Sequence, residues 1–351
     1  MRKLGTVALR FCLVGFCLAS AGLRAQSCQT SGEIEPARLK SIQDAALRYF
    51  DLAAKGDISK LQASSVAGAA AEFSPITKAT FENSPVDAKA TVRQSFLLEA
   101  DAAATIPRAE FLCGTFGKNG QTANSAVFVL TNLRPATYAV VIFDIERRPQ
   151  SNLPDLLSLV LENVPAGSPG ASPGDDKKEI KDDWKLAAAF LRWAHMAGHD
   201  SAWFAVRAAQ FQEKDQRRNA WLYYLASRTL ASPLPFMSTA VTDKLYDAVR
   251  DTQSADWPSD ANPVDFAAGG AHCKLTSISP EGHDSDVYVV VRYQASDISN
   301  TVKTNAQSVV LMRAMVAKFP ELRAAFAGIV ARAVTPAGTD FGTLLTMKDV
   351  R

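Results

Sequence analysis

The chain has 351 residues, of which 38 are Lys or Arg, 36 are Asp or Glu, and 47% are hydrophobic. This hydrophobic content is ordinary for a globular protein and argues against extended disorder, and the length predicts two or three domains. Because the charge is nearly balanced and no stripe of Lys and Arg is present, the sequence offers no electrostatic basis for binding nucleic acid or an anionic membrane surface.

Residues 1–25 have the features of a secretory signal peptide. The start is positive with no acidic residue, and an apolar run over residues 11–19 follows. Small residues then allow cleavage after Ala21 or after Ala25. The apolar run is about half of the roughly 20 residues that a membrane span requires. We therefore expect a soluble periplasmic or secreted protein with no membrane span.

The mature chain would keep three cysteines, Cys28, Cys113 and Cys273. They form no CxxC pair and no zinc framework, so at most one disulfide is expected, with its pairing left open. Lipidation at Cys28 is disfavoured because Gln26 fits a lipidation box poorly. Cys113 lies in an apolar segment and is interpreted as a small buried side chain.

Residues 36–195 have the pattern of an α+β domain. Apolar residues at helical spacing predict a helix over residues 42–53, which Gly56 ends, and a short helix that Asp57 or Ser59 caps. A further helical stretch is predicted over residues 92–103. Short segments rich in Val, Phe and Ile then predict strands over residues 110–117, 126–133, 137–146 and 156–163. Residues 165–176 are a loop by composition, and residues 184–191 are a last strand or the start of a helix.

The phrase Tyr49-Phe50-Asp51-Leu52-Ala53-Ala54-Lys55-Gly56-Asp57, followed later by this run of strands, resembles the start of the NTF2-like (SnoaL-like) fold. The resemblance covers residues 36–193. It implies helices packed into the concave face of a curved antiparallel sheet, where members of the family have a pocket. The chain departs from the family plan in its long connection between residues 61 and 110.

Residues 196–255 are predicted to form an αα-hairpin that bridges two domains. The aromatic and apolar residues over residues 200–232 have the spacing of a single tetratricopeptide repeat, with no second copy. These side chains are interpreted as core: Trp203, Phe204, Phe211, Trp221, Tyr223, Tyr224 and Leu225. Residues 263–351 then predict a small ββαββ domain, in which one helix over residues 305–326 covers a sheet.

Two clusters are candidates for chemistry. His195, His199 and Asp200 are dense enough for a metal site if a helix brings the two imidazoles to one face. However, Gly198 weakens such a helix, Met196 stands where a zinc peptidase has its Glu, and Asp200 is typical of a helix cap. A polar linker with no metal is therefore favoured.

Asp144 and Glu146 lie two apart on a predicted strand, so both point to one face of the sheet. In an apolar pocket they could act as general acid and base. The alternative is a strand end in water, which Arg147 and Arg148 favour. The glycines at Gly114, Gly117 and Gly120 fit a turn, and no cofactor is expected.

The sequence thus favours an exported, non-enzymatic binding or assembly module with an unknown small-molecule or protein partner. The alternative is a pocket-based hydrolase or isomerase that uses an acidic residue of the N-terminal sheet.

Overall fold

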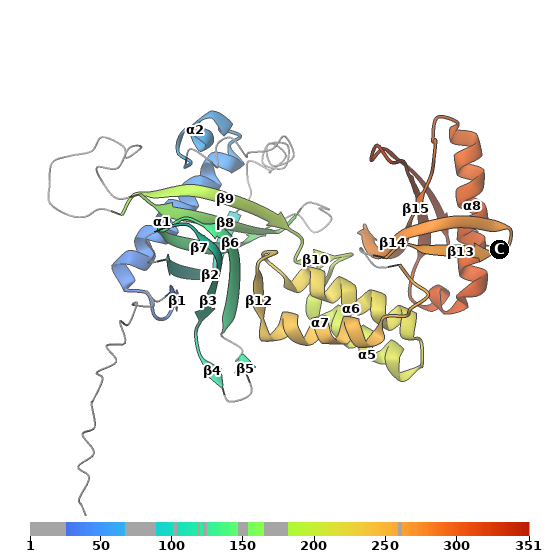
Figure 1. Cartoon of the computed structure of the whole chain (residues 1–351), viewed down its shortest axis with the longest axis horizontal. Helices are drawn as coiled ribbons and strands as arrows, with labels where there is room; N and C mark the ends of the chain where they lie inside the picture. Colours follow the sequence, from blue (N-terminus) through green and yellow to red (C-terminus); the bar gives the residue numbers. More distant parts are fainter. Residues whose placement is uncertain are drawn as a thin grey trace, which may run out of the picture.

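The computed structural model describes residues 26–66, 89–100, 104–117, 120–121, 125–146, 154–164, 182–258 and 262–350. The expectations for the signal peptide, for the loop over residues 165–176 and for Arg147 and Arg148 lie outside these residues. The fold is mixed α+β, as predicted, with helices and several antiparallel sheets. Figure 1 shows an N-terminal body and a C-terminal sheet, with a group of helices between them.

The N-terminal body contains a five-stranded antiparallel sheet in the order β1-β2-β7-β8-β9. The elements in this part are β1 (Gln26–Thr30), α1 (Pro36–Ala54), α2 (Ile58–Ala63), β2 (Lys89–Ala100), β3 (Ile106–Cys113), β4 (Phe116–Gly117), β5 (Gly120–Gln121), β6 (Ala126–Leu133), β7 (Thr137–Glu146), β8 (Leu156–Asn163) and β9 (Trp184–Arg192). Residues 184–191 are thus strand rather than helix.

Helix α1 covers one face of this sheet. Its start is fixed by Glu35, whose carboxylate accepts from the N–H groups of Ala37 and Arg38, and Gly56 ends it with φ of 67°. Glycine suits that left-handed conformation because it lacks a Cβ. The buried face of α1 packs on alternate residues of β7, including Val141 and Phe143. The predicted helix is confirmed.

The helix predicted over residues 92–103 is wrong, because this segment is strand β2. Phe96 and Leu98 point to one face and Leu97 to the other, and all three are buried. A strand that is covered on both faces loses the alternation of polar and apolar residues. Its continuous apolar run cannot then be distinguished from a buried helix by period alone.

A second sheet, in the order β12-β6-β3, covers the opposite face of the five-stranded sheet. Phe111 and Phe128 of this sheet pack with Phe96 of β2, and the rings of Phe96 and Phe128 meet edge to face at 5.0 Å. The N-terminal body therefore has three layers, one of helix and two of sheet. Both faces of its central sheet are filled by side chains.

Strand β12 does not come from the N-terminal segment but from the middle of the chain. The elements here are β10 (His195–Met196), β11 (His199–Asp200), α5 (Ser201–Glu213), α6 (Arg217–Ala231), β12 (Met237–Thr239) and α7 (Ala240–Thr252). Met237 pairs with Phe128 of β6. The segment between α6 and α7 therefore becomes the edge strand of the N-terminal body.

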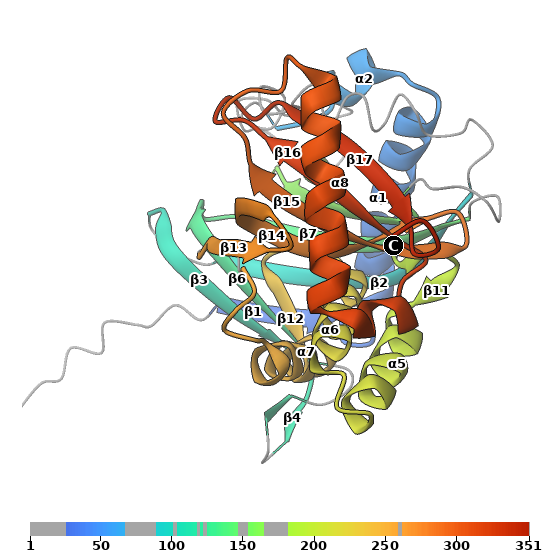
Figure 2. The same cartoon turned by 90° about the vertical axis from the view of Figure 1, so that its right-hand side faces the viewer.

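The C-terminal segment forms a sheet in the order β13-β14-β15-β16-β17. Its elements are β13 (Val264–Ala268), β14 (Ala271–His283), β15 (Asp286–Gln294), α8 (Thr301–Lys318), η1 (Pro320–Ala324), β16 (Gly328–Val334) and β17 (Asp340–Thr346). The predicted order of two strands, a helix and two strands is present, preceded by β13. Strands β15 and β16 are parallel, and α8, which connects them, lies in front of the sheet in Figure 2.

Helices α5 and α6 share one hydrophobic cluster with this C-terminal sheet. Phe204, Phe211 and Trp221 belong to the same cluster as Val289 of β15 and Leu311 of α8. The helices are thus packed on the C-terminal sheet, whereas the segment that follows α6 is hydrogen-bonded into the N-terminal body. The junction of the two parts lies where α6 ends.

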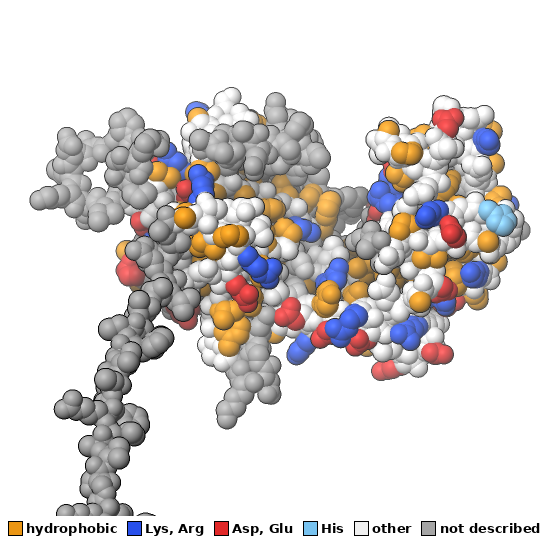
Figure 3. Space-filling model, in the orientation of Figure 1, with side chains coloured by type: hydrophobic (Ala, Val, Ile, Leu, Met, Phe, Trp, Pro, Cys, Tyr) orange, Lys and Arg blue, Asp and Glu red, His pale blue; other side chains and the backbone are white. Residues whose placement is uncertain are grey.

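The surface mixes charges of both signs. On the face drawn in Figure 3, Lys and Arg alternate with Asp and Glu among the coloured residues. None of the helices among the described residues combines the length and the hydropathy of a membrane-spanning segment.

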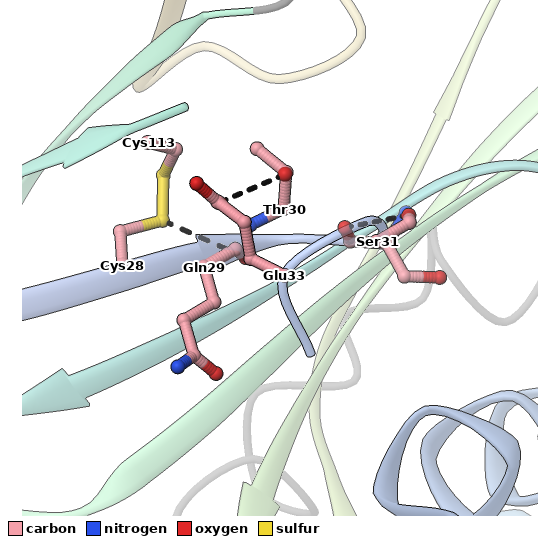
Figure 4. The surroundings of a disulfide bond; sticks show 7 residues. Cys28, Gln29, Thr30, Ser31, Glu33 and Cys113 are labelled. Atoms are coloured by element: carbon pink, nitrogen blue, oxygen red, sulfur yellow. Dashed lines mark hydrogen bonds between the residues drawn. A yellow bond between two sulfur atoms is a disulfide. The ribbon is translucent and has the colours of Figure 1, made fainter. Parts of the chain in front are cut away.

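A disulfide joins Cys28 of β1 to Cys113 of β3 (Figure 4). Cys113 is buried as expected, but as half of this bridge. Cys273 has a free thiol, and burial raises its pKa to about 11. Because the sulfur of Cys28 is bonded to another sulfur, it cannot carry a thioether lipid in this folded state.

Candidate functional site

The three side chains of the histidine cluster, His195, His199 and Asp200, contact three different partners. His195 Nδ1 hydrogen-bonds to Asp155, while the ring of His199 stacks on Trp203 at 3.7 Å and 4°. Asp200 caps α5 by accepting from the N–H of Trp203 at 2.8 Å. The side chains therefore do not converge on one point. Among the described residues, no group of three or more His, Cys, Asp or Glu could hold a metal ion.

Asp144 and Glu146 lie on one face at the end of β7. Asp144 forms a two-point ion pair with Arg93 of the neighbouring strand, through Nε at 3.0 Å and through Nη2. Its side chain is 45% exposed, and Glu146 is exposed. The guanidinium balances the carboxylate, and water reaches it. This environment does not provide the apolar pocket that acid/base chemistry by the pair requires.

A groove lies at the junction of the N-terminal body and the helices. It has a volume of about 320 Å³, and four elements contribute to it: the end of β9, the end of α6, the segment with β12, and α7. Its lining residues are Arg192, Arg228, Thr229, Ser232, Leu234, Pro235, Met237, Ser238, Thr242, Asp243 and Tyr246. This volume is at the lower end of the range for ligand sites.

The sequence after α6 explains why the groove forms there. Pro233 and Pro235 cannot continue a helix, and Leu234 between them is buried in the N-terminal body. Ser158 of β8 donates to the carbonyl of Pro233 at 3.3 Å, and Phe236 packs edge to face on Phe190 of β9 at 5.4 Å. These contacts hold the end of α6 beside the end of β9.

Two arginines of the groove have no ionic partner among the residues that the structure describes. Arg192 comes from β9 and Arg228 from α6, and neither guanidinium makes a hydrogen bond or ion pair with any residue the structure describes. The Arg228 guanidinium lies 5.8 Å from the ring centre of Tyr246, which is cation–π range. Both arginines are only partly exposed. The groove thus presents ten N–H donors with few acceptors from the protein.

The opposite charge in the groove comes from Asp243 in the first turn of α7. Ser238 hydrogen-bonds to its carboxylate, which lowers the pKa, but burial and the nearby charge of Asp247 raise it more. The net effect is a pKa above the usual value. Burial is the larger cause of this shift and the charge of Asp247 the smaller one, and a cation beside the carboxylate would favour its charged form.

The hydroxyl of Thr242 already has hydrogen-bond partners within the protein. It donates to the carbonyl of Thr239 at 3.0 Å and accepts from the N–H of the same residue at 2.7 Å, which completes the capping box of α7. The groove is thus chemically simple. It has two guanidinium groups with no ion pair to a described residue, one carboxylate and an aromatic ring, and Leu234 and Met237 add apolar lining.

A larger groove, of about 540 Å³, follows α1 beside Asp182 and Trp184. Its charged groups largely pair with each other or with neighbouring residues. Lys40 pairs with Asp44 at 2.6 Å, and Arg38 reaches Asp182 at 3.5 Å. Arg48 is the exception, because its guanidinium lies 5.2 Å from the ring centre of Tyr49 and has no ion pair among the described residues. This groove thus has one arginine without an ionic partner, whereas the junction groove has two.

Sequence reasoning did not find the junction groove. Its charged residues lie 15 to 51 positions apart in the sequence, on elements with no motif between them. The available signal was the Ser232-Pro233-Leu234-Pro235 segment, which marks an abrupt end of α6. Comparison with known protein families, with curated proteins and with solved structures finds no match to the chain.

Proposed function

We propose that the protein is an exported, non-enzymatic binding module and that its ligand site is the junction groove. The observation that carries this proposal is the pair of partly buried guanidinium groups, Arg192 and Arg228, which line one groove without an ionic partner among the described residues. Withdrawing a charge from water has a cost unless a partner offsets it. Guanidinium groups bind carboxylate and phosphate through paired N–H donors.

Compensation of helix dipoles is the simplest alternative. Arg228 is in the last turn of α6, where a positive charge stabilises the helix dipole. Asp243 is in the first turn of α7, where a negative charge does the same. This alternative does not account for Arg192, which is on a strand. The convergence of two arginines from different elements supports a role in binding an anionic group.

Two further features support the proposal. The disulfide between Cys28 and Cys113 fits an oxidising compartment, as export requires. The acid that the sequence offered for catalysis, Asp144, is paired with Arg93 on the surface and away from the groove.

Isothermal titration calorimetry tests the proposal with a set of small carboxylates, amino acids and inorganic phosphate as probes. We expect at least one to bind the wild type, and Arg192→Gln and Arg228→Gln each to weaken it by at least about ten-fold, which is about 1.4 kcal/mol. Arg134→Gln is the matched control, because Arg134 is an exposed arginine that pairs with Glu162 outside the groove. Absence of binding by every probe, or equal binding by the double variant, contradicts the proposal.

One observation favours a second function, a hydrolase or isomerase. Asp155 accepts from the N–H of Ala194 and contacts Nδ1 of His195, which leaves Nε2 of a half-exposed imidazole for proton transfer. A carboxylate at Nδ1 orients an imidazole as a general base. Hydrolysis of model esters that is lost in His195→Gln, but kept in His283→Gln, would replace the binding proposal. His283 is an exposed histidine that also neighbours an aspartate, Asp284.

A further inference from the structure

We infer that the junction groove selects a small zwitterion, a free α-amino acid, with its carboxylate on Arg192 and Arg228 and its ammonium group on Asp243. This inference rests on the proposed function and adds the chemical class of the ligand. It depends on the presence of both charge signs within one groove.

The size of the groove limits the ligand. A volume of about 320 Å³ accommodates a molecule of about ten non-hydrogen atoms and no long chain. A ligand of this size still has room for two oppositely charged groups, which match the two charge signs of the lining. The positive and the negative groups of the groove are then expected to bind two oppositely charged groups of one small molecule.

The positive side of the groove is the stronger one. Arg192 and Arg228 together outweigh the single carboxylate of Asp243. A bound carboxylate would neutralise part of this charge, so we expect the ligand to have an anionic group. Because the guanidinium groups come from β9 and α6, the carboxylate would also connect the N-terminal body to the helices.

The negative side explains why a simple anion is not the best ligand. Asp243 is held by Ser238, and the charge of Asp247, one turn further along α7, acts on it as well. An anion beside Asp243 adds a second negative charge there, while the charge of Asp247 is partly balanced by its ion pair with Arg250. An ammonium group near Asp243 reverses the sign of that interaction and favours the charged carboxylate.

The apolar groups of the groove offer a place for the ligand side chain. Tyr246 is 56% exposed, and one face of its ring is turned to Arg228 at 5.8 Å. Leu234 and Met237 are buried beneath. An aromatic or long aliphatic side chain on the ligand would cover the exposed ring and bury its own apolar surface.

Calorimetry with matched ligands tests the inference on the full mature protein. The probes are phenylalanine and leucine, their deaminated analogues 3-phenylpropionate and 4-methylpentanoate, and the corresponding amines, phenethylamine and isopentylamine. We expect an amino acid to bind at least about ten-fold more tightly than its deaminated analogue, and the amines not to bind. Asp243→Asn should weaken the amino acid to the level of the analogue and leave the analogue unchanged or slightly tighter.

Asp251→Asn is the control, because Asp251 is an exposed acid of the same helix outside the groove. A thermal unfolding midpoint for Asp243→Asn close to that of wild type shows that a loss of affinity is not a loss of fold. If the deaminated analogues bind as tightly as the amino acids through the two arginines, the inference is wrong while the proposed function stands. If no carboxylate binds in any form, both are wrong.

Discussion

The disulfide between Cys28 and Cys113 connects β1 of the five-stranded N-terminal sheet to the last residue of β3, with the two Cα atoms 4.8 Å apart. The bridge closes a loop of 85 residues. It therefore spans α1, α2 and β2, and it fixes the two sheets of the N-terminal body to each other through the first described strand. The thiol of Cys273 belongs to the C-terminal sheet.

The double variant Cys28→Ser/Cys113→Ser should lose about 2–5 kcal/mol of unfolding free energy, because closure of a long loop restricts the unfolded chain. Urea unfolding with and without reductant checks this. Cys273→Ser is the control and should change little. Peptide mapping that finds Cys273 bonded to either partner would contradict the assignment.

Trp221→Ala should destabilise the protein by about 3–5 kcal/mol. The ring is 5% exposed and meets Trp257 edge to face at 5.7 Å, and Trp257 in turn meets Phe319 at 5.5 Å. The loss should thus extend from α6 to the C-terminal sheet in one transition. Tyr246→Ala, which removes an exposed ring, provides the comparison. A thermal midpoint within about a degree of wild type for Trp221→Ala is incompatible with this packing.

Alkaline pH should destabilise the protein through two buried tyrosines. Burial raises the pKa of Tyr138 and of Tyr223 to about 12, and each hydroxyl donates to a backbone carbonyl. The folded state keeps these protons while the unfolded state loses them near pH 10, so their contribution is complete below pH 10 and falls as the pH rises towards 12. Each tyrosine accounts for up to about 2–3 kcal/mol.

Urea midpoints at pH 8, 10 and 11.5 measure this effect. Tyr223→Phe should have a flatter pH dependence than wild type in that window. Equal slopes for the two proteins would show that Tyr223 ionises in the folded state as readily as in the unfolded state.

If the protein is exported as proposed, its signal peptide should be cleaved off. Mass spectrometry of protein from its native host should find Gly22 or Gln26 as the first residue. Both cleavages keep β1 whole, because the strand begins at Gln26, opposite Ala100. Protein that keeps Met1 in the cytoplasmic fraction is the contrary result.

The sequence was most informative where one face of an element is polar. The helix at Pro36–Ala54 was found because its apolar residues repeat at helical spacing. Strand β2 was missed because both of its faces are buried. Helix α7 was missed because its capping box uses Thr242 at the third position, where the usual signal is Glu or Gln.

The helix α8 begins earlier than predicted, since Asn300 caps it, and it ends at Lys318 before Pro320.

The candidate site could not be predicted from the sequence because its residues come together only through pairing of distant segments. Asp144 and Glu146 do share a face, as their spacing predicted, but only the pairing of β2 with β7 brings Arg93 to Asp144. Likewise, Arg192 and Arg228 line one groove because Leu234 is buried in the N-terminal body, which holds the end of α6 beside the end of β9.

A crystal structure of the mature protein, grown with the tightest-binding amino acid of the calorimetric set, tests the central claim most directly. The account predicts ligand density in the groove, with a carboxylate within about 3 Å of both the Arg192 and Arg228 guanidinium groups. It also predicts an ammonium group at the same range from Asp243. Ligand bound elsewhere, with only water between the two arginines, would contradict the account.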